Sequence, residues 1–160
     1  PDLETAIIYS GLCLIEGTNL SEGRGTDKPF KLIGAPWFNV DDFLEEFNMN
    51  IHQGIQIEKT TFIPRKIKGK SNYPKYENIE CNGIKINITN MNKARPLEFS
   101  IYLINAIYAS HKKYFKFNSN NFIDKLYGSD QLRLYVLNEL NIQELINSWE
   151  KFDNSKYLIY

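Results

Sequence analysis

The sequence has few of the residues that build metal centres, disulfide frameworks or membrane spans. Its 160 residues include two cysteines and two histidines, and none of them has a second ligand at metal-binding spacing. Two cysteines are too few for a disulfide scaffold, so Cys13 and Cys81 are expected to act as small hydrophobic side chains. No apolar run approaches the roughly 20 residues that a membrane-spanning helix requires. We therefore expect no metal, no cofactor and no membrane span.

An excess of either charge is also missing, because 19 basic residues balance 19 acidic residues. Without a positive field the chain has no electrostatic preference for nucleic acid. The short basic run "PRKIKGK" at 64–70 lacks interleaved aromatic residues, so it is interpreted as a solvated loop. The 42% hydrophobic and 24% charged residues are ordinary values for one globular domain over residues 1–160. Because the chain opens on Pro1, we expect it to be a piece of a longer protein.

Strand patterns come early in the chain. Alternation of apolar and polar residues predicts strands at 55–63 and 83–90, with Ile84, Ile86 and Ile88 on one buried face. A brief extended piece is expected at 33–37, where Ala35 precedes a proline. The short apolar run at 12–16 is interpreted as a buried strand that follows a helix ending at Gly11.

Helical patterns dominate the second half. An Asp41 cap predicts a helix at 41–49, and the mostly apolar stretch 97–111 is typical of a central helix. Further helices are expected at 120–128 with a glycine stop, at 129–140 with Ser129 as cap, and at 141–152 with a capping box, followed by a docked terminus at 156–160. The fold class is α+β: a single domain with a small, mostly antiparallel or mixed sheet and a helical carboxy-terminal half.

A polar, glycine-rich stretch at 16–30, "EGTNLSEGRGTDKPF", lies between two apolar runs. It does not match a phosphate-binding loop, because five residues separate Gly17 from Gly23 and Arg24 stands where lysine belongs. It also lacks the third glycine of a dinucleotide fingerprint. The stretch is therefore either a self-bracing loop or the polar part of a binding site.

Both possibilities have physical support. As a brace, Arg24 would pair with Glu16 or Glu22 and the glycines would supply positive φ angles. As a site, several of these side chains would converge on a hydroxyl-rich ligand, Arg24 would bind a carboxylate, and a nearby tryptophan would offer a platform for a sugar ring. The candidate ligand-binding residues are Glu16, Asn19, Ser21, Arg24, Thr26 and Trp37.

The stretch "LETAIIYSGLCLIEGTNLSEGRGTDKPFKLIGAPW" resembles the start of the carboxy-terminal region of NamZ-type exo-β-N-acetylmuramidases. The likeness continues through "CNGIKINITN", "RPLEFSIYLINAIY", "FIDKLYGSDQLR" and "IQELINSW", and so covers essentially the whole chain. These bacterial glycoside hydrolases release terminal N-acetylmuramic acid from peptidoglycan fragments. The chain departs from relatives at Ser10, where a proline is frequent, and at 89–91, where "TDR" is frequent.

The resemblance implies that this chain is the carboxy-terminal auxiliary half of a two-domain glycosidase. The missing amino-terminal, Rossmann-like domain would carry the catalytic carboxylate, and the stretch at 16–30 would form this half's wall of the shared cleft. The implied partners are that domain and muramyl saccharides from peptidoglycan. Peptidoglycan as substrate implies export or recycling, with an extracellular or periplasmic location favoured over a cytoplasmic one. A non-catalytic carbohydrate-binding or structural interdomain module is the alternative.

Overall fold

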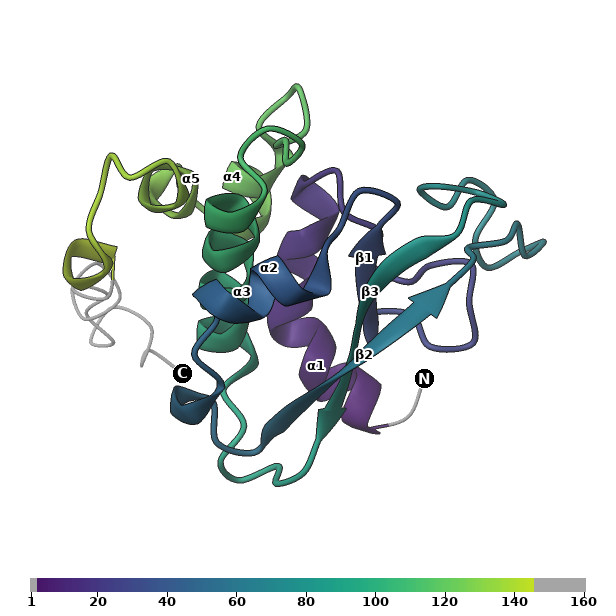
Figure 1. Cartoon of the computed structure of the whole chain (residues 1–160), viewed down its shortest axis with the longest axis horizontal. Coiled ribbons are helices and arrows are strands. Elements are labelled where there is room, and N and C mark those ends of the chain that lie inside the picture. The colour runs from purple at the N-terminus through teal and green to yellow at the C-terminus, as the bar shows by residue number, and fades with distance from the viewer. Residues whose placement is uncertain (1–2, 146–160) are drawn as a thin grey trace, which may run out of the picture.

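The computed structural model describes residues 3–145, in which helices pack against one side of a small sheet (Figure 1). The strands are β1 (Leu32–Ala35), β2 (Ile55–Phe62) and β3 (Cys81–Ile88). The helices are α1 (Leu3–Leu12), α2 (Val40–Glu46), α3 (Pro96–Ser110), α4 (Phe122–Tyr127) and α5 (Gln131–Val136), with 3₁₀ segments η1 (Cys13–Gly17) and η2 (Met49–Ile51). The predicted α+β class is confirmed, including the helical second half.

The sheet is antiparallel, with β3 between β1 and β2. Ile84 and Ile86 of β3 are fully buried and Ile88 is half-buried, while Lys85 between them stays partly exposed. The predicted face of this strand is therefore confirmed. Residues of α1 and α3 belong to the same hydrophobic core, so one core joins the sheet to the helices.

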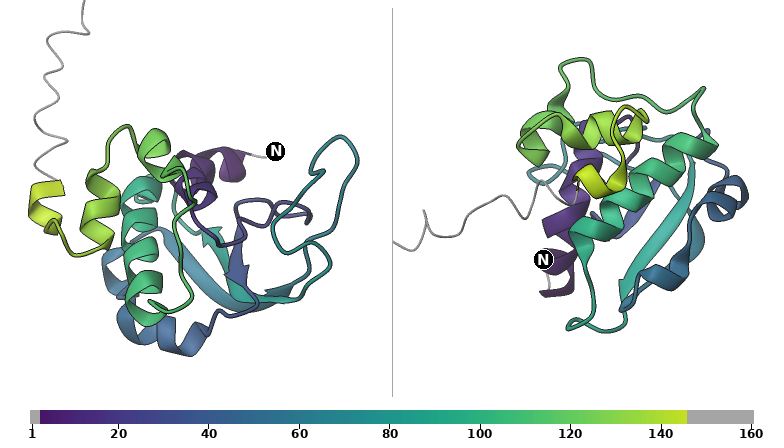
Figure 2. Two further views of the ribbon diagram at one scale, coloured as in Figure 1. Left: turned by 90° about the horizontal axis from the view of Figure 1, so that it is seen from above. Right: turned by 90° about the vertical axis from the view of Figure 1, so that its left-hand side faces the viewer.

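The central position of α3 is also confirmed, since it contacts α1, α2 and α5. Its apolar residues are buried along most of its length, and Pro96 starts it at a position where the missing N–H carries no penalty. The two views in Figure 2 show α3 beside α1, with the α4–α5 region covering one end.

The strand predicted at 12–16 is wrong, because this segment forms η1. Gly11 does not end the preceding helix: a Cβ on it would lie 2.1 Å from the Pro96 carbonyl oxygen, so glycine lets α1 and α3 approach closely. The chain therefore stays helical through Leu12 and tightens into a 3₁₀ turn, whose end is capped when Thr18 donates its N–H to the Ile15 carbonyl. A short apolar run cannot by itself distinguish a buried strand from a buried helical turn.

Two predicted caps are also corrected. Helix α2 is capped by Asn39, whose Oδ1 accepts from the N–H groups of Asp41 and Asp42, and the helix ends at Glu46. Helix α5 follows Asp130 rather than Ser129, has no side-chain cap bond, and ends at Val136.

The other predicted helix ends agree with the structure. The glycine stop of α4 is confirmed, with Gly128 in the left-handed conformation. The Asn141–Glu144 capping box is confirmed by two reciprocal 2.9 Å hydrogen bonds. The rest of that predicted helix and the predicted docking of 156–160 lie outside the described residues.

Candidate functional site

The first part of the polar loop, residues 16–22, is packed into the domain; we call it the inner half. The side chain of Asn19 forms two hydrogen bonds with the backbone of residues 114–116. Its Nδ2 donates to the Tyr114 carbonyl and its Oδ1 accepts from the Lys116 N–H, both at 2.9 Å. Ser21 is buried, forms a backbone bridge with Gly34, and accepts from the Gly23 N–H through Oγ. These two polar side chains are thus engaged inside the domain.

A charged network lies under the loop. Glu22 is 4% exposed, and its carboxylate lies 3.5 Å from Arg24 Nε and 3.0 Å from Lys75 Nζ. Arg24 also reaches Glu16 at 3.2 Å through Nη2 and lies over the Phe30 ring, 5.0 Å from its centroid. The internal pairing considered for Arg24 is therefore present, and 39% of the Arg24 side chain remains exposed.

Residues 23–30 form the outer half of the loop, in which Asp27 and Lys28 are exposed while Gly23, Gly25 and Phe30 are buried. Thr26 Oγ1 donates to the Gly23 carbonyl at 2.7 Å and accepts from the Lys28 N–H at 3.1 Å, closing a tight turn. Gly25 has a φ of 84°, and a Cβ there would lie 2.5 Å from the Arg65 carbonyl oxygen. This glycine therefore permits close approach of the segment that follows β2, which also donates its Arg65 N–H to the Gly25 carbonyl.

A hollow of about 700 Å³ opens beside the outer half. Arg24 and Thr26 line it from the loop, Phe30 adds an apolar surface, and Ile67 and Lys70 line it from the segment that follows β2. Both Arg24 and Lys70 are cations, whereas Asp27 is the acidic side chain of the lining, so the hollow is suited to an anion that also carries apolar groups.

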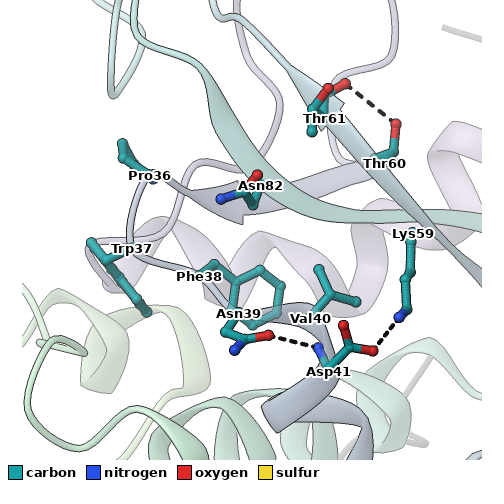
Figure 3. Close-up of a pocket in the computed structure, with 10 residues that line it drawn as sticks. All are labelled: Pro36, Trp37, Phe38, Asn39, Val40, Asp41, Lys59, Thr60, Thr61 and Asn82. Carbon is teal, nitrogen blue, oxygen red and sulfur yellow. Dashed lines mark hydrogen bonds and ion pairs between the residues drawn. The ribbon is translucent and has the colours of Figure 1, made fainter.

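A second hollow, of about 620 Å³, lies at the end of the sheet (Figure 3). Trp37 forms one side of it, Asn82 of β3 lies across from the ring, and an ion pair between Lys59 and Asp41 borders it. Aromatic and amide side chains around an open hollow are a combination that binds neutral hydroxyl-rich molecules. Trp37 is half-buried and stacks on Tyr114, with ring centroids 6.2 Å apart.

His111 holds the backbone of Asn39, which lines the second hollow. Its Nε2 accepts the Asn39 N–H at 2.9 Å, and its Nδ1 lies 2.7 Å from Ser110 Oγ. Burial lowers the pKa of this imidazole, with Asp42 opposing the shift. A neutral ring is what the Asn39 contact requires, because a protonated Nε2 cannot accept a hydrogen bond.

The six residues predicted from the sequence do not form one cluster. Arg24 and Thr26 line the first hollow and Trp37 lines the second, whereas Glu16, Asn19 and Ser21 line neither. Two residues that the sequence did not indicate connect these parts, namely Lys75 beneath Glu22 and Tyr76 between Asn19 and Trp37. Their only sequence signal is a position in a loop rich in prolines and lysines.

Three further observations on residues 3–145 concern metal ligands, membrane spans and thiols. Among residues 3–145, no group of three or more potential metal ligands lies together. No helix in that part of the chain is long and apolar enough to cross a membrane. Both cysteines are free thiols there, and burial raises the pKa of Cys81 to about 11, which makes it a poor nucleophile at neutral pH.

Comparison with known proteins identifies the domain. The family model described as "Exo-beta-N-acetylmuramidase NamZ, C-terminal" matches residues 7–160. The peptidoglycan β-N-acetylmuramidase NamZ of Bacillus subtilis (strain 168) is 32% identical over 166 residues, which cover 100% of this chain and 38% of that protein. This chain thus spans well under half the length of that relative.

Two solved structures of DUF1343 family proteins from Bacteroides fragilis share the fold. One has a TM-score of 0.64 at 26% identity and covers 100% of this chain and 42% of its own. The other has a TM-score of 0.65 at 19% identity and covers 80% of this chain and 33% of its own. Together with the match over residues 7–160, the whole-chain likeness to a named relative decides the assignment: this chain belongs to the family of NamZ carboxy-terminal domains.

Proposed function

We propose that the full-length protein is an exo-glycosidase that releases terminal N-acetylmuramic acid from peptidoglycan fragments, and that this domain forms one wall of its interdomain cleft. The outer half of the loop would lie at the rim of that wall. The observation that carries the proposal is Arg24, a half-exposed cation that is held by two carboxylates and lines a hollow. The relative from Bacillus subtilis, named as a peptidoglycan β-N-acetylmuramidase, supports the reaction class.

The role of this domain in the proposed reaction is binding. Glycosidases need two carboxyl groups on opposite sides of the scissile bond. Glu22 is buried in ion pairs, and Glu16 is committed to Arg24, so neither is arranged as a free acid or base. We therefore place the main catalytic carboxylate on the amino-terminal domain and substrate contacts on this one.

Arg24 is proposed to recognise the lactyl carboxylate of N-acetylmuramic acid. That group adds a negative charge which N-acetylglucosamine lacks, and a guanidinium fixed by neighbours discriminates it better than a mobile ammonium. Thr26 and Lys70 line the same hollow and would contact the remaining polar atoms of the sugar. A charge-assisted contact of this kind contributes roughly 1.5–3 kcal/mol, or about ten- to a hundredfold in binding.

The test compares Arg24→Lys with the wild type in the full-length enzyme, on chromogenic glycosides of N-acetylmuramic acid and N-acetylglucosamine. Arg65→Lys is the matched control, because Arg65 is exposed and lies next to the same loop. We expect Arg24→Lys to raise KM for the muramic substrate about tenfold or more, with the melting temperature nearly unchanged. A variant that loses several degrees of thermal stability and keeps its sugar preference would rule out the recognition role.

A structural interdomain brace is the second candidate, and one observation favours it. The polar side-chain atoms of Asn19 and Ser21 form hydrogen bonds within the domain. If the loop only braces, Arg24→Lys should lower stability and impair all substrates equally. The same assay therefore separates the two functions.

The isolated 160-residue chain should fold, because its apolar segments enclose a common core. It should not hydrolyse muramyl glycosides, since the other half of the cleft is absent. Cooperative thermal unfolding together with zero turnover is the expected result. Robust turnover by this fragment alone would contradict the two-domain proposal.

A further inference from the structure

Two consecutive residues, Lys75 and Tyr76, connect the parts of the candidate site. They lie in the segment 63–80 that joins β2 to β3 and runs beside the outer half of the loop in both Figure 1 and Figure 2. The backbone hydrogen bond from Arg65 to Gly25 ties the start of this segment to the loop. The segment therefore belongs to the structure of the site, although the sequence suggested only a solvated loop for its basic part.

Lys75 holds the inner half of the loop from beneath. Its Nζ donates to the Leu20 carbonyl at 2.9 Å and to the carbonyls of Ile15 and Glu16 at 3.4 Å. With its N–H groups directed at these carbonyls, the ammonium still lies 3.0 Å from Glu22 Oε2 as an ion-pair partner. It thus neutralises the buried carboxylate that in turn contacts Arg24.

Tyr76 connects the inner half of the loop to Trp37, which lines the second hollow. Its hydroxyl donates to the Asn19 carbonyl at 2.7 Å and accepts the Trp37 indole N–H at 3.1 Å. Burial raises the pKa of Tyr76, so the hydroxyl keeps the proton that this relay requires. The Trp37 ring is therefore held in its orientation by a hydrogen-bonded link to the loop backbone at Asn19.

The backbone at Tyr76 is itself unusual. Its φ is 57°, a left-handed conformation that side chains other than glycine and asparagine seldom adopt. Such conformations persist where the surrounding contacts outweigh the strain, and they concentrate at functional positions. This turn carries both Lys75, which bonds to the inner half of the loop, and Tyr76, which bonds to Asn19 and Trp37.

We propose that Lys75 and Tyr76 are positioning residues of the glycosidase site: Lys75 sets Arg24 through Glu22, and Tyr76 sets the ring of Trp37. This inference rests on the proposed function, in which Arg24 and Trp37 contact the saccharide. Neither residue lines the two hollows, so neither contacts substrate in this arrangement. Their effect on catalysis passes through the residues that they hold.

The experiment uses the full-length enzyme with Tyr76→Phe, Lys75→Met and Lys75→Arg. Tyr73→Phe and Lys66→Met are matched controls from the same segment, since Tyr73 is 90% exposed and Lys66 is exposed as well. We expect Tyr76→Phe and Lys75→Met to raise KM for a chromogenic muramic acid glycoside about five- to tenfold, with kcat within twofold. Lys75→Arg should recover most of the loss, and the controls should match the wild type.

A double-mutant cycle tests whether Tyr76 acts through Trp37. Trp37→Phe already removes the indole N–H, so adding Tyr76→Phe to it should cause little further loss in kcat/KM. Additive losses would overturn the inference. So would losses that follow the change in melting temperature alone, because these indicate a purely structural role.

A spectroscopic measurement separates this inference from the proposed function. The emission of Trp37 is obtained by subtracting the spectrum of the Trp37→Phe protein, and it should shift in Tyr76→Phe but not in Tyr73→Phe. If the wild type has no muramidase activity, the proposed function fails, whereas this shift still reports on the positioning of Trp37. An unchanged emission overturns the inference in either case.

Discussion

The two halves of the loop at 16–30 are both made largely of polar and glycine residues, but their surroundings differ. The inner half lies among residues from α4, the 114–118 region and the segment before β3, and a Cβ on Gly17 would lie 2.6 Å from the side chain of Ile123. The outer half borders the 700 Å³ hollow, and its Asp27 and Lys28 are exposed. One half of a polar, glycine-rich loop can thus be packed inside the domain while the other half borders an open hollow.

The difference shows how a polar loop can be both rigid and accessible. The Asn19 and Ser21 side chains and the Leu20 N–H of the inner half form hydrogen bonds inside the domain, which reduces the penalty of burying them. Arg24 stands at the junction, with its guanidinium fixed from below by Glu16 and Glu22. A contact residue held in this way loses little conformational freedom when a ligand binds.

The largest expected effect is on stability, from Glu22→Ala in the inner half. Removing this carboxylate leaves Lys75 and Arg24 without their shared partner. Because these two cations are partly exposed, the expected cost is about 3 kcal/mol, at the lower end of the range for a fully buried pair. Urea unfolding of the 160-residue chain should show the loss, with the exposed Asp27→Ala of the outer half as control. Equal free energies of unfolding for the two variants would contradict the claim that the inner half contributes more to stability than the outer half.

The second expected effect is a loss of stability in acid, which arises at His52, outside the loop at 16–30. His52 is 6% exposed and stacks on Phe47, and burial lowers its pKa from 6.5 to about 4. Because the folded-state pKa lies below the unfolded value, stability is full above pH 6.5 and declines as the pH falls toward 4. The decline attributable to His52 is on the order of 3 kcal/mol.

The measurement for His52 is the free energy of unfolding between pH 7 and 4, in the wild type and in His52→Phe. The variant should show a shallower decline over this range. If the free energies of unfolding of the two proteins decline in parallel with pH, His52 is not the source of the acid sensitivity. In either case, substrate assays of loop variants are best made above pH 6.5, where this contribution is constant.

The smallest expected effect is from Thr26→Val in the outer half. The change keeps the shape of the side chain but removes the hydrogen bonds with Gly23 and Lys28, which stabilise the turn by about 1 kcal/mol. The melting temperature should fall slightly, and KM for the muramic glycoside should rise more than the stability change explains. A loss confined to stability would assign Thr26 to the brace.

The sequence predicted the strands well, because alternation of isoleucine with polar residues in β3 leaves only one register that buries the apolar face. It failed at 12–16, where the close approach of Gly11 to Pro96 favours continued helical structure. For the site, the pairing of Arg24 with nearby glutamates could be anticipated from their spacing. Lys75 and Tyr76 could not, since their partners lie 39–60 positions away and no local pattern records such contacts.

The pairing of Asn19 with the 114–116 backbone has a consequence for biosynthesis. The inner half is completed by residues 95–102 positions further along the chain, including Asn118, which donates to the Glu16 carbonyl. At roughly 5–20 residues per second, the ribosome takes about 5–20 s to supply them after the loop has been made. During that interval the loop lacks its partners, so the candidate site is assembled only after the chain beyond α3 has emerged.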